Sequence, residues 1–287
     1  MKILVTGAGG KTGRFVINAL RIRNVQVRAW VRTPDHASKF PPDIESFWGD
    51  ALDASLWPKA LKDVDAVYHI APNMFPYEFE LGKLAIDAAK EAGIERFVFH
   101  SVLHPQTEAM PHHWWKLRVE EYLFTSGLMF TILQPTAYMQ NLLSQWPVIL
   151  DEGVLRQPYA PETRISLVDL GDVAEAAATV LLEPGHEGAT YELVGTPPLS
   201  QYDVAAVLSK ALARPVRAEA ISRGTWARRM SGLSEYARTT LLKMFEYYEK
   251  YGLVGNPHVL HWLLGRDPHS LGEWVEALLV REGYVGW

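Results

Sequence analysis

The chain contains no cysteine among its 287 residues. That absence excludes disulfide bonds, zinc sites built from thiolates and a cysteine nucleophile. The chain also has no surplus of positive charge, because 28 lysine and arginine residues stand against 33 aspartate and glutamate residues, for a net charge of −5. We therefore expect no nucleic-acid partner, which a basic surface would indicate.

Long apolar runs are missing as well, and no stretch approaches the roughly 18 apolar residues that indicate a membrane-spanning helix. The first expected strand starts at residue 2, which leaves no room for a signal peptide, so we expect a soluble, cytoplasmic protein with no membrane partner. Hydrophobic residues are nevertheless plentiful, at 48% of the chain. This content suffices for a sizeable core, in one large domain or in a domain with an added lobe.

The amino-terminal residues carry the most specific motif of the chain. The apolar run 1–6 predicts a buried strand, and a helical pattern covers residues 14–23. The turn between them contains Gly7, Gly9, Gly10, Lys11, Thr12 and Gly13. A strand, a glycine turn and a helix in this order cradle the pyrophosphate of a dinucleotide, because the backbone can approach the ligand and the first N–H groups of the helix face the phosphates.

Two alternatives compete with a dinucleotide site. Gly10-Lys11-Thr12 resembles the end of a nucleoside-triphosphate loop, but that loop needs a glycine six residues before its lysine, where this chain has Val5. A turn that serves only the fold is the other alternative, since turns are rich in glycine. Because the motif follows the first strand, where a dinucleotide-binding fold needs it, we favour dinucleotide binding.

Strands and helices alternate after this motif. The expected strands are residues 25–31, 44–47, 65–70, 97–100 and 129–133, and the expected helices are 54–61, 77–92 and 112–125, with Asp53 as an N-cap. Such alternation predicts an α/β fold, with a doubly wound parallel sheet and helices on both of its faces. Beyond Pro135 the alternation loosens into 165–168 (strand), 169–182 (helix), 190–194 (strand) and then helices at 201–212, 223–230, 235–251 and 271–282.

This change of pattern predicts two domains. A dinucleotide-binding domain of the Rossmann type covers residues 1–140 and 164–183. A smaller, mainly helical carboxy-terminal lobe covers residues 141–163 and 184–287, binds the substrate and closes over the cofactor. We find no internal repeat or low-complexity segment in either part of the sequence.

The end of the second strand indicates which dinucleotide binds. A carboxylate there would accept hydrogen bonds from the ribose of NAD, whereas this chain has Arg32, whose guanidinium can pair with the 2′-phosphate of NADP. Lys11 offers a second cation nearby, so we expect NADP(H) to be favoured over NAD(H); a solvated arginine at a strand end is the alternative. Asp50 and Ala51 follow the third strand, where the carboxylate of Asp50 can accept from the adenine amino group or serve an ordinary turn.

Taken together, these motifs resemble the NmrA-like family of atypical short-chain dehydrogenases/reductases. The matching residues are Gly7-x-x-Gly10-x-x-Gly13, Val31-Arg32-Thr33-Pro34, Gly49-Asp50, Ala89-x-x-Ala92-Gly93-Ile94, Ser101, Lys116 with Glu120, and Leu133-Gln134-Pro135-x-x-x-Met139-x-Asn141. They cover the nucleotide-binding half well and the carboxy-terminal part only loosely. The resemblance implies an NADPH-dependent reductase, a relative that acts on quinones or dyes, or a redox-sensing regulator with little turnover.

Short-chain dehydrogenases ordinarily have a tyrosine four residues before the lysine that holds the nicotinamide ribose. None of the eleven lysines here has that tyrosine, and His112 stands four residues before Lys116, on the same side of one helix turn. We expect Lys116 to fix the ribose and stabilise negative charge, His112 or a water that it holds to protonate the product, and Ser101 to donate a hydrogen bond to the substrate oxygen. The alternative for His112 is a solvent-exposed histidine at a helix start.

Two further segments complete the expected cofactor groove. Ala71, Pro72 and Asn73 follow the fourth strand, and Pro135 follows the sixth, where the backbone passes the ribose and nicotinamide in this fold. Just beyond, Tyr138 and Asn141 are expected to point toward the substrate; a structural role for the tyrosine is equally open.

Aromatic and sulfur-bearing residues form the expected lining of the substrate pocket, and Trp114 and Trp115 are the members that we assign to substrate. The full set is Phe75, Tyr77, Trp114, Trp115, Tyr138, Met139, Trp146, Trp226, Met244, Phe245 and Tyr248. Such a lining suits a flat, apolar small molecule such as a quinone, an aryl ketone or a conjugated enone. We expect about a third of the set to line a pocket and the rest to be core, since Phe245 and Tyr248 share one helical face.

His258, His261 and His269 could suggest a metal site, but none is expected, because His258 and His261 have no carboxylate nearby at a recognised ligand spacing. Two functions remain open. The first is an NADPH-dependent oxidoreductase that transfers hydride to a small apolar carbonyl, enone or quinone-like substrate, and the pair His112 and Lys116 favours it. The second is an NADP(H)-binding redox sensor with a protein partner and little or no turnover, which the missing tyrosine favours.

Overall fold

The computed structural model describes residues 1–281 and divides into two compact units. The first unit contains Met1–Gln134 and Val173–Tyr191, and the second contains Pro135–Asp172 and the chain from Glu192 onward. Within the described residues, no helix is long and apolar enough to cross a membrane. The expected assignment of a cofactor domain and a substrate lobe to particular ranges of the chain stays a prediction.

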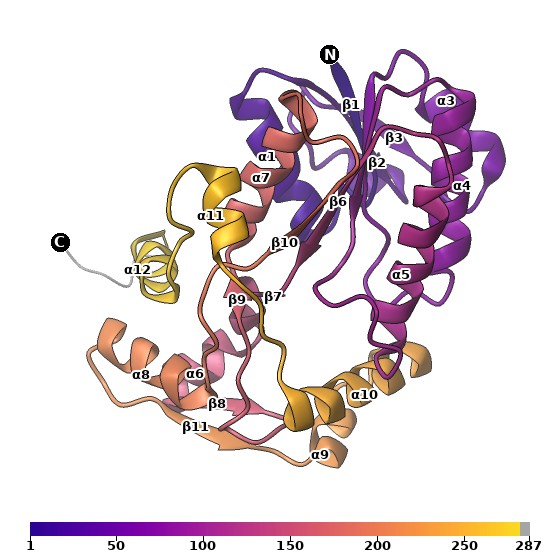
Figure 1. Cartoon of the computed structure of the whole chain (residues 1–287). Coiled ribbons are helices and arrows are strands. Elements are labelled where there is room, and N and C mark those ends of the chain that lie inside the picture. The colour runs from indigo at the N-terminus through magenta and orange to yellow at the C-terminus, as the bar shows by residue number, and fades with distance from the viewer. Residues whose placement is uncertain (282–287) are drawn as a thin grey trace. The chain divides into compact units, whose positions relative to one another are not determined.

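Seven parallel strands organise the first unit, in the order β10-β6-β5-β4-β1-β2-β3 (Figure 1). The strands are β1 (Lys2–Val5), β2 (Gln26–Val31), β3 (Glu45–Trp48), β4 (Ala66–His69), β5 (Arg96–His100), β6 (Phe130–Pro135) and β10 (Ala189–Leu193). Ile3 of β1 pairs with Val27 of β2 on one side and with Ala66 of β4 on the other. The order of connection reverses between β1 and β4, and in such sheets ligands bind outside the carboxyl ends of the strands at this reversal.

Helices cover both faces of this sheet, as the doubly wound prediction requires. They are α1 (Lys11–Ile22), α2 (Pro34–Ala37), α3 (Trp57–Ala60), α4 (Glu78–Glu91), α5 (Pro111–Phe124) and α7 (Leu170–Leu182). Helices α4 and α5 lie together on one face, and α1 and α7 lie on the other (Figure 1). The core under α4 and α5 is fully apolar at its centre, where Leu4, Phe97 and Val119 are all completely buried. The sheet and its α/β architecture are therefore confirmed.

The second unit is mainly helical and has its own core. Its elements are β7 (Ala137–Tyr138), the 3-10 helix η2 (Met139–Gln145), α6 (Trp146–Glu152), β8 (Val154–Gln157), β9 (Leu167–Val168), α8 (Gln201–Ala211), β11 (Arg217–Ala220), α9 (Arg223–Arg229), α10 (Glu235–Tyr251), α11 (His258–Leu264) and α12 (Leu271–Arg281). The core contains Met139, Ile149, Leu208 and Val275, which are buried completely. Two small parallel sheets, β11-β8 and β7-β9, complete the unit.

Most expected elements are present, and the differences have local causes. The helix expected at 54–61 is a 3-10 turn, η1 (Ala54–Leu56), followed by the short α3, because Pro58 has no N–H to continue a hydrogen-bonded helix from the preceding turn. The strand expected at 165–168 is only β9, since Ile165 forms isolated bridges with Leu199 and Leu253. Glu282, the expected end of the last helix, lies outside the described residues.

Candidate functional site

The glycine turn after β1 has the geometry that a phosphate cradle needs. Gly7 adopts a φ of +59°, and a Cβ on it would lie 2.8 Å from the carbonyl oxygen of Ile70. A Cβ on Gly13 would lie 2.5 Å from the carbonyl oxygen of Gly7, so any larger residue would separate α1 from the turn. The N–H of Gly10 donates to the oxygen of Gly7 at 3.0 Å, which closes the turn just before α1.

The start of α1 is open to an anion. Gly10 is its N-cap residue, and within the described residues no side chain caps the helix and its first turn carries no carboxylate. The first N–H groups of a helix lack partners within the helix and lie at the positive end of its dipole. The turn and helix start therefore fit the diphosphate of a dinucleotide. Gly9 lies in the turn as expected, whereas Lys11 and Thr12, expected in the turn, are the first two residues of α1.

Arg32 and Lys11 supply exposed positive charge beside this cradle. Arg32 directly follows β2, and within residues 1–281 its side chain forms no hydrogen bond or ion pair. Lys11 is also exposed, although partial burial lowers the pKa of its ammonium. Both fit an extra phosphate on the ribose, which a carboxylate at the end of β2 would repel.

The other predicted cofactor residues lie in turns at the carboxyl ends of strands. Asp50 is exposed, and one of its carboxylate oxygens accepts from the N–H of Leu52 at 3.0 Å, so it does serve a turn. Its second oxygen can still accept from an adenine. Ala51 lies beside it, half-buried.

The segment after β4 also lies where the sequence predicted it. Ala71 is buried, whereas Pro72 and Asn73 are exposed, and Met74 has a φ of 50°. Pro135 is the last residue of β6 and is buried. These backbone segments are available to line a cofactor groove.

Lys116 is held by a partner that sequence reasoning missed. Its ammonium lies 2.7 Å from a carboxylate oxygen of Glu78 and 3.4 Å from the carbonyl oxygen of His100. It also lies 5.5 Å from the centre of the Phe99 ring. The side chain of Glu78 is only 4% exposed and that of Lys116 15%. Burial raises the pKa of Glu78, and Lys116 opposes this rise.

Ser101 belongs to a second buried hydrogen-bond group. Its hydroxyl donates to Glu120, whose carboxylate also accepts from the amide of Gln134 at 2.9 and 3.0 Å. Ser101 is 2% exposed, and burial raises the pKa of Glu120. Because its single hydrogen is directed to Glu120, the arrangement favours a role for Ser101 in positioning this group, and the predicted donation to a substrate oxygen would need that hydrogen to be released.

His112 is half-buried and lies against His113, with ring centres 4.4 Å apart. Burial lowers the pKa of His112 to about 2, with smaller contributions from His113 and Lys116. Its Nδ1 is buried and has no hydrogen-bond partner within the described residues. The imidazole is therefore neutral near pH 7, so it can hold a water or an oxygen but is not the imidazolium donor that an ordinary pKa would allow.

Two more histidines lie on the sheet near this group, and sequence reasoning did not select them. His100, at the end of β5, shares a hydrogen bond of 2.7 Å with the hydroxyl of Tyr68. His69, at the end of β4, lies 3.0 Å from the hydroxyl oxygen of Thr6. Burial lowers the pKa of each histidine to about 3. Only their position at the ends of neighbouring strands could have signalled them.

The predicted aromatic lining divides between core and surface. In the first unit, Tyr77 is 53% and Trp115 is 38% exposed, and Trp114 is half-buried. In the second unit, Tyr138 is half-buried and Asn141 is exposed. The predicted members that are buried in the second unit are Met139, Trp146, Phe245 and Tyr248.

Two shallow hollows occur in the second unit. One, of about 300 Å³, is lined by Gly195, Pro257, His258, His261, Asp267 and Pro268. The other, of about 260 Å³, includes Tyr248 in its wall. Neither contains Tyr138 or Asn141, so neither supports their predicted contact with substrate.

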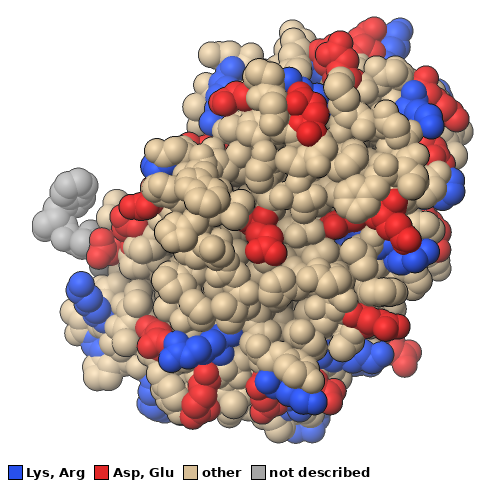
Figure 2. Space-filling view, in the orientation of Figure 1, with Lys and Arg blue, Asp and Glu red and all other residues tan. Residues whose placement is uncertain are grey.

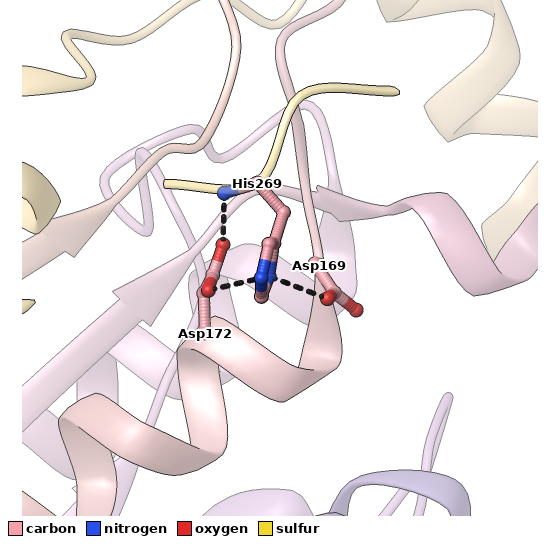
Figure 3. A group of neighbouring side chains, drawn as sticks. All are labelled: Asp169, Asp172 and His269. Atoms are coloured by element: carbon pink, nitrogen blue, oxygen red, sulfur yellow. Dashed lines mark hydrogen bonds and ion pairs between the residues drawn. The ribbon is translucent and has the colours of Figure 1, made fainter. Parts of the chain in front are cut away.

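Asp169, Asp172 and His269 form a cluster in the second unit (Figure 3). The ring Nδ1 of His269 lies 3.0 Å from Asp169 and 2.8 Å from Asp172, and its backbone N–H donates to Asp172 at 2.7 Å. Arg266 also donates to Asp172, which is completely buried, at 2.8 Å. Because the side chains of Arg266 and His269 already contact these carboxylates, the cluster is a network of hydrogen bonds and ion pairs within the second unit, between the loop before α12 and the residues Asp169 and Asp172.

The molecular face drawn in Figure 2 is mainly uncharged, with small groups of acidic and basic side chains scattered over it. Red and blue side chains lie side by side there, and neither sign forms a broad patch. This distribution matches the small net charge of −5.

The chain resembles a defined group of known proteins. The model of the NmrA-like family matches residues 1–277. The chain is 31% identical over 279 residues to the NAD(P)H azoreductase of Xenophilus azovorans, with 96% of this chain and 97% of that protein covered. It is 29% identical over 281 residues to quinone oxidoreductase 2 of Escherichia coli strain K12, covering 96% of this chain and 98% of that protein.

Solved structures show the same likeness. The crystal structure of an NADPH-dependent quinone oxidoreductase from Escherichia coli, complexed with NADPH, superposes with a TM-score of 0.84 at 29% identity. The superposition covers 96% of this chain and 99% of that one.

Proposed function

Since the chain belongs to the NmrA-like family, we propose that it is an NADPH-dependent oxidoreductase that transfers hydride to a small apolar carbonyl, enone or quinone-like substrate. The observation that carries the proposal is the open glycine cradle with Arg32 exposed and unpaired beside it. That combination suits NADP(H) better than NAD(H). The relatives named for azo and quinone reduction support a conjugated acceptor as the substrate class.

NADPH supplies the hydride when bound, and the residues of the chain position it. The cradle of Gly7, Gly10 and Gly13 would hold the diphosphate through backbone N–H groups, and Arg32 would pair with the 2′-phosphate. Lys116 would donate to a hydroxyl of the nicotinamide ribose and place positive charge near the developing anion.

His112 would complete the reaction as a neutral imidazole. Its pKa of about 2 means that it carries no proton to give as an imidazolium near pH 7. In this proposal it holds a water or the substrate oxygen by a hydrogen bond, and solvent provides the proton that the reduced product takes up.

One experiment tests the enzyme against the second candidate. The purified protein is mixed with NADPH and a panel of quinones, enones and aryl aldehydes, and cofactor absorbance is followed. Steady oxidation of NADPH that depends on one of these acceptors is the expected result. NADPH binding without turnover, with different affinities for the oxidised and reduced cofactor, would instead identify an NADP(H)-sensing regulator with a protein partner. The missing tyrosine before Lys116 is the observation that favours that candidate.

A further inference from the structure

Glu78 and Lys116 meet although they come from different helices. Glu78 is the first residue of α4, and Lys116 lies within α5. A carboxylate in the first turn of a helix ordinarily faces solvent and favours the positive end of the helix dipole. Glu78 instead turns inward and is only 4% exposed, so its burial requires a specific partner.

Close packing of α4 against α5 makes this contact possible. One turn after Glu78, Gly82 faces Val119, and a Cβ on that glycine would lie 2.6 Å from both Val119 methyl groups. Only a glycine allows the two helices to approach so closely there. The approach brings the carboxylate of Glu78 over the ammonium of Lys116 at 2.7 Å.

The surroundings of Lys116 leave one direction for its remaining hydrogen. An ammonium has three hydrogens, and the described residues provide two oxygen acceptors, on Glu78 and on His100. The Phe99 ring covers a further side of the charge. The third N–H and the 15% of the side chain that stays exposed are therefore available to a ligand.

We propose that Glu78 is a positioning residue, which holds the Lys116 ammonium in place so that its free N–H meets the nicotinamide ribose of NADPH. The inference rests on the proposed function, because it needs Lys116 to contact the cofactor. Without the carboxylate, the flexible lysine side chain extends toward water and loses its fixed geometry.

The test is a double-mutant cycle on NADPH affinity, read from quenching of tryptophan fluorescence. Lys116→Met is expected to raise the Kd for NADPH about tenfold or more, and Glu78→Gln about tenfold, in line with loss of one charge-assisted hydrogen bond. If Glu78 acts through Lys116, adding Glu78→Gln to Lys116→Met changes the Kd by less than about twofold. A purely structural role would instead weaken binding by the same factor in both backgrounds.

Matched variants control for charge and for folding. Glu80→Gln removes an exposed carboxylate from the same helix and is expected to leave the Kd unchanged. Glu78→Asp keeps the charge but shortens its reach, and should weaken binding less than Glu78→Gln does. Thermal unfolding without cofactor shows whether each variant is folded, and the cycle is evaluated among folded variants.

The outcomes separate this inference from the proposed function. Additive effects of the two substitutions, or an unchanged Kd in both folded Glu78 variants, would overturn the role of Glu78 while leaving the reductase intact. A wild-type protein that neither binds nor oxidises NADPH would refute the proposed function itself.

Discussion

Arg28, in β2, and Arg32, directly after it, show how two residues of the same type differ in their contacts. Arg28 is buried in β2, where it donates to the carbonyl oxygens of Ala60 and Lys62 at 2.6 and 2.7 Å and pairs with Glu45 at 2.7 Å. All three nitrogens of its guanidinium contact other residues of the fold. Arg32 has no such contacts within the described chain and is exposed, so its charge is available to a ligand.

Replacing Arg32 by glutamine should therefore change the cofactor preference and little else. We expect Arg32→Gln to weaken NADPH binding by about tenfold to a hundredfold, because a bidentate pair with the 2′-phosphate is lost. NADH affinity should change by less than about twofold, since NADH has no such phosphate. Calorimetric titration of both cofactors measures the difference.

Lys90→Gln is the matched control for this substitution. Lys90 is an exposed cation in the last turn of α4, and its removal should affect neither titration. Equal weakening of NADPH and NADH by Arg32→Gln would contradict the assignment of Arg32 to the 2′-phosphate.

Among single residues, the sequence singled out the glycine turn and Arg32, whose contacts with the cofactor stay predictions, but it did not identify the partners of Lys116. Gly7, Gly10 and Gly13 are adjacent in the chain to the elements they join, so local pattern suffices to find them. Glu78 could not be found in this way, because its burial depends on how closely α4 packs on α5. The predicted behaviour of His112 differs for a similar reason, since its surroundings lower its pKa to about 2.

At the level of elements, the segment formed by β1, the glycine turn and α1 has the strictest steric limits in the candidate site. Its geometry depends on Gly13, where a Cβ would meet the Gly7 carbonyl oxygen at 2.5 Å. Gly13→Ala should lower the free energy of unfolding by about 1–3 kcal/mol through this overpacking. NADPH binding should weaken as well, because α1 is displaced from the turn.

Gly272→Ala provides a control with the same chemical change. Gly272 lies in α12, and the nearest atom to a Cβ there is 3.8 Å away. Alanine at that position should be neutral or stabilise the protein by up to about 1 kcal/mol, because it favours helix. Urea unfolding of both variants makes the comparison, and an unaffected Gly13→Ala would show that the cradle is looser than described.

Elements with a regular apolar pattern were predicted from the sequence. Elements that form only through pairing between distant segments of the chain were not. The strands and helices of residues 1–135 follow clear apolar patterns. Strands β8 and β11 were not predicted, because the pairing that forms them joins segments far apart in the chain. Helix α11, of seven residues, was not predicted either.

For the whole molecule, buried histidines determine part of the response to acid. His69, His100 and His113 have pKa values lowered to about 3, 3 and 4, mainly by burial, from an ordinary value of 6.5. The unfolded chain binds protons to these groups at higher pH than the folded chain does. Their contribution to stability is therefore complete above pH 6.5 and is lost as the pH falls toward their folded values.

Substituting one of these histidines isolates the effect. His69→Asn keeps a polar atom near Thr6 but cannot titrate. Between pH 6 and pH 4 the free energy of unfolding of this variant should therefore fall less steeply than that of the wild type, and the two slopes should differ by about 1.4 kcal/mol per pH unit. Comparison with the wild type also cancels the buried carboxylates Glu78 and Glu120, whose raised pKa values act in the opposite direction.

Urea unfolding at several pH values measures these slopes. His36→Asn, at an exposed position in α2, should leave the slope unchanged. A His69→Asn slope equal to that of the wild type would show that the imidazole does not titrate on unfolding in this range.

The chain leaves the first unit after Gln134 and returns to it only at Val173. During synthesis, β6 therefore cannot pair with β10, its neighbour in the sheet, until the intervening part of the second unit has been made. A nascent chain that stops at residue 134 leaves β6 as an exposed edge strand. Its unpaired N–H and C=O groups can then pair with other chains. Fragments cut at that point should aggregate, so attempts to produce the first unit alone must include residues 173–191.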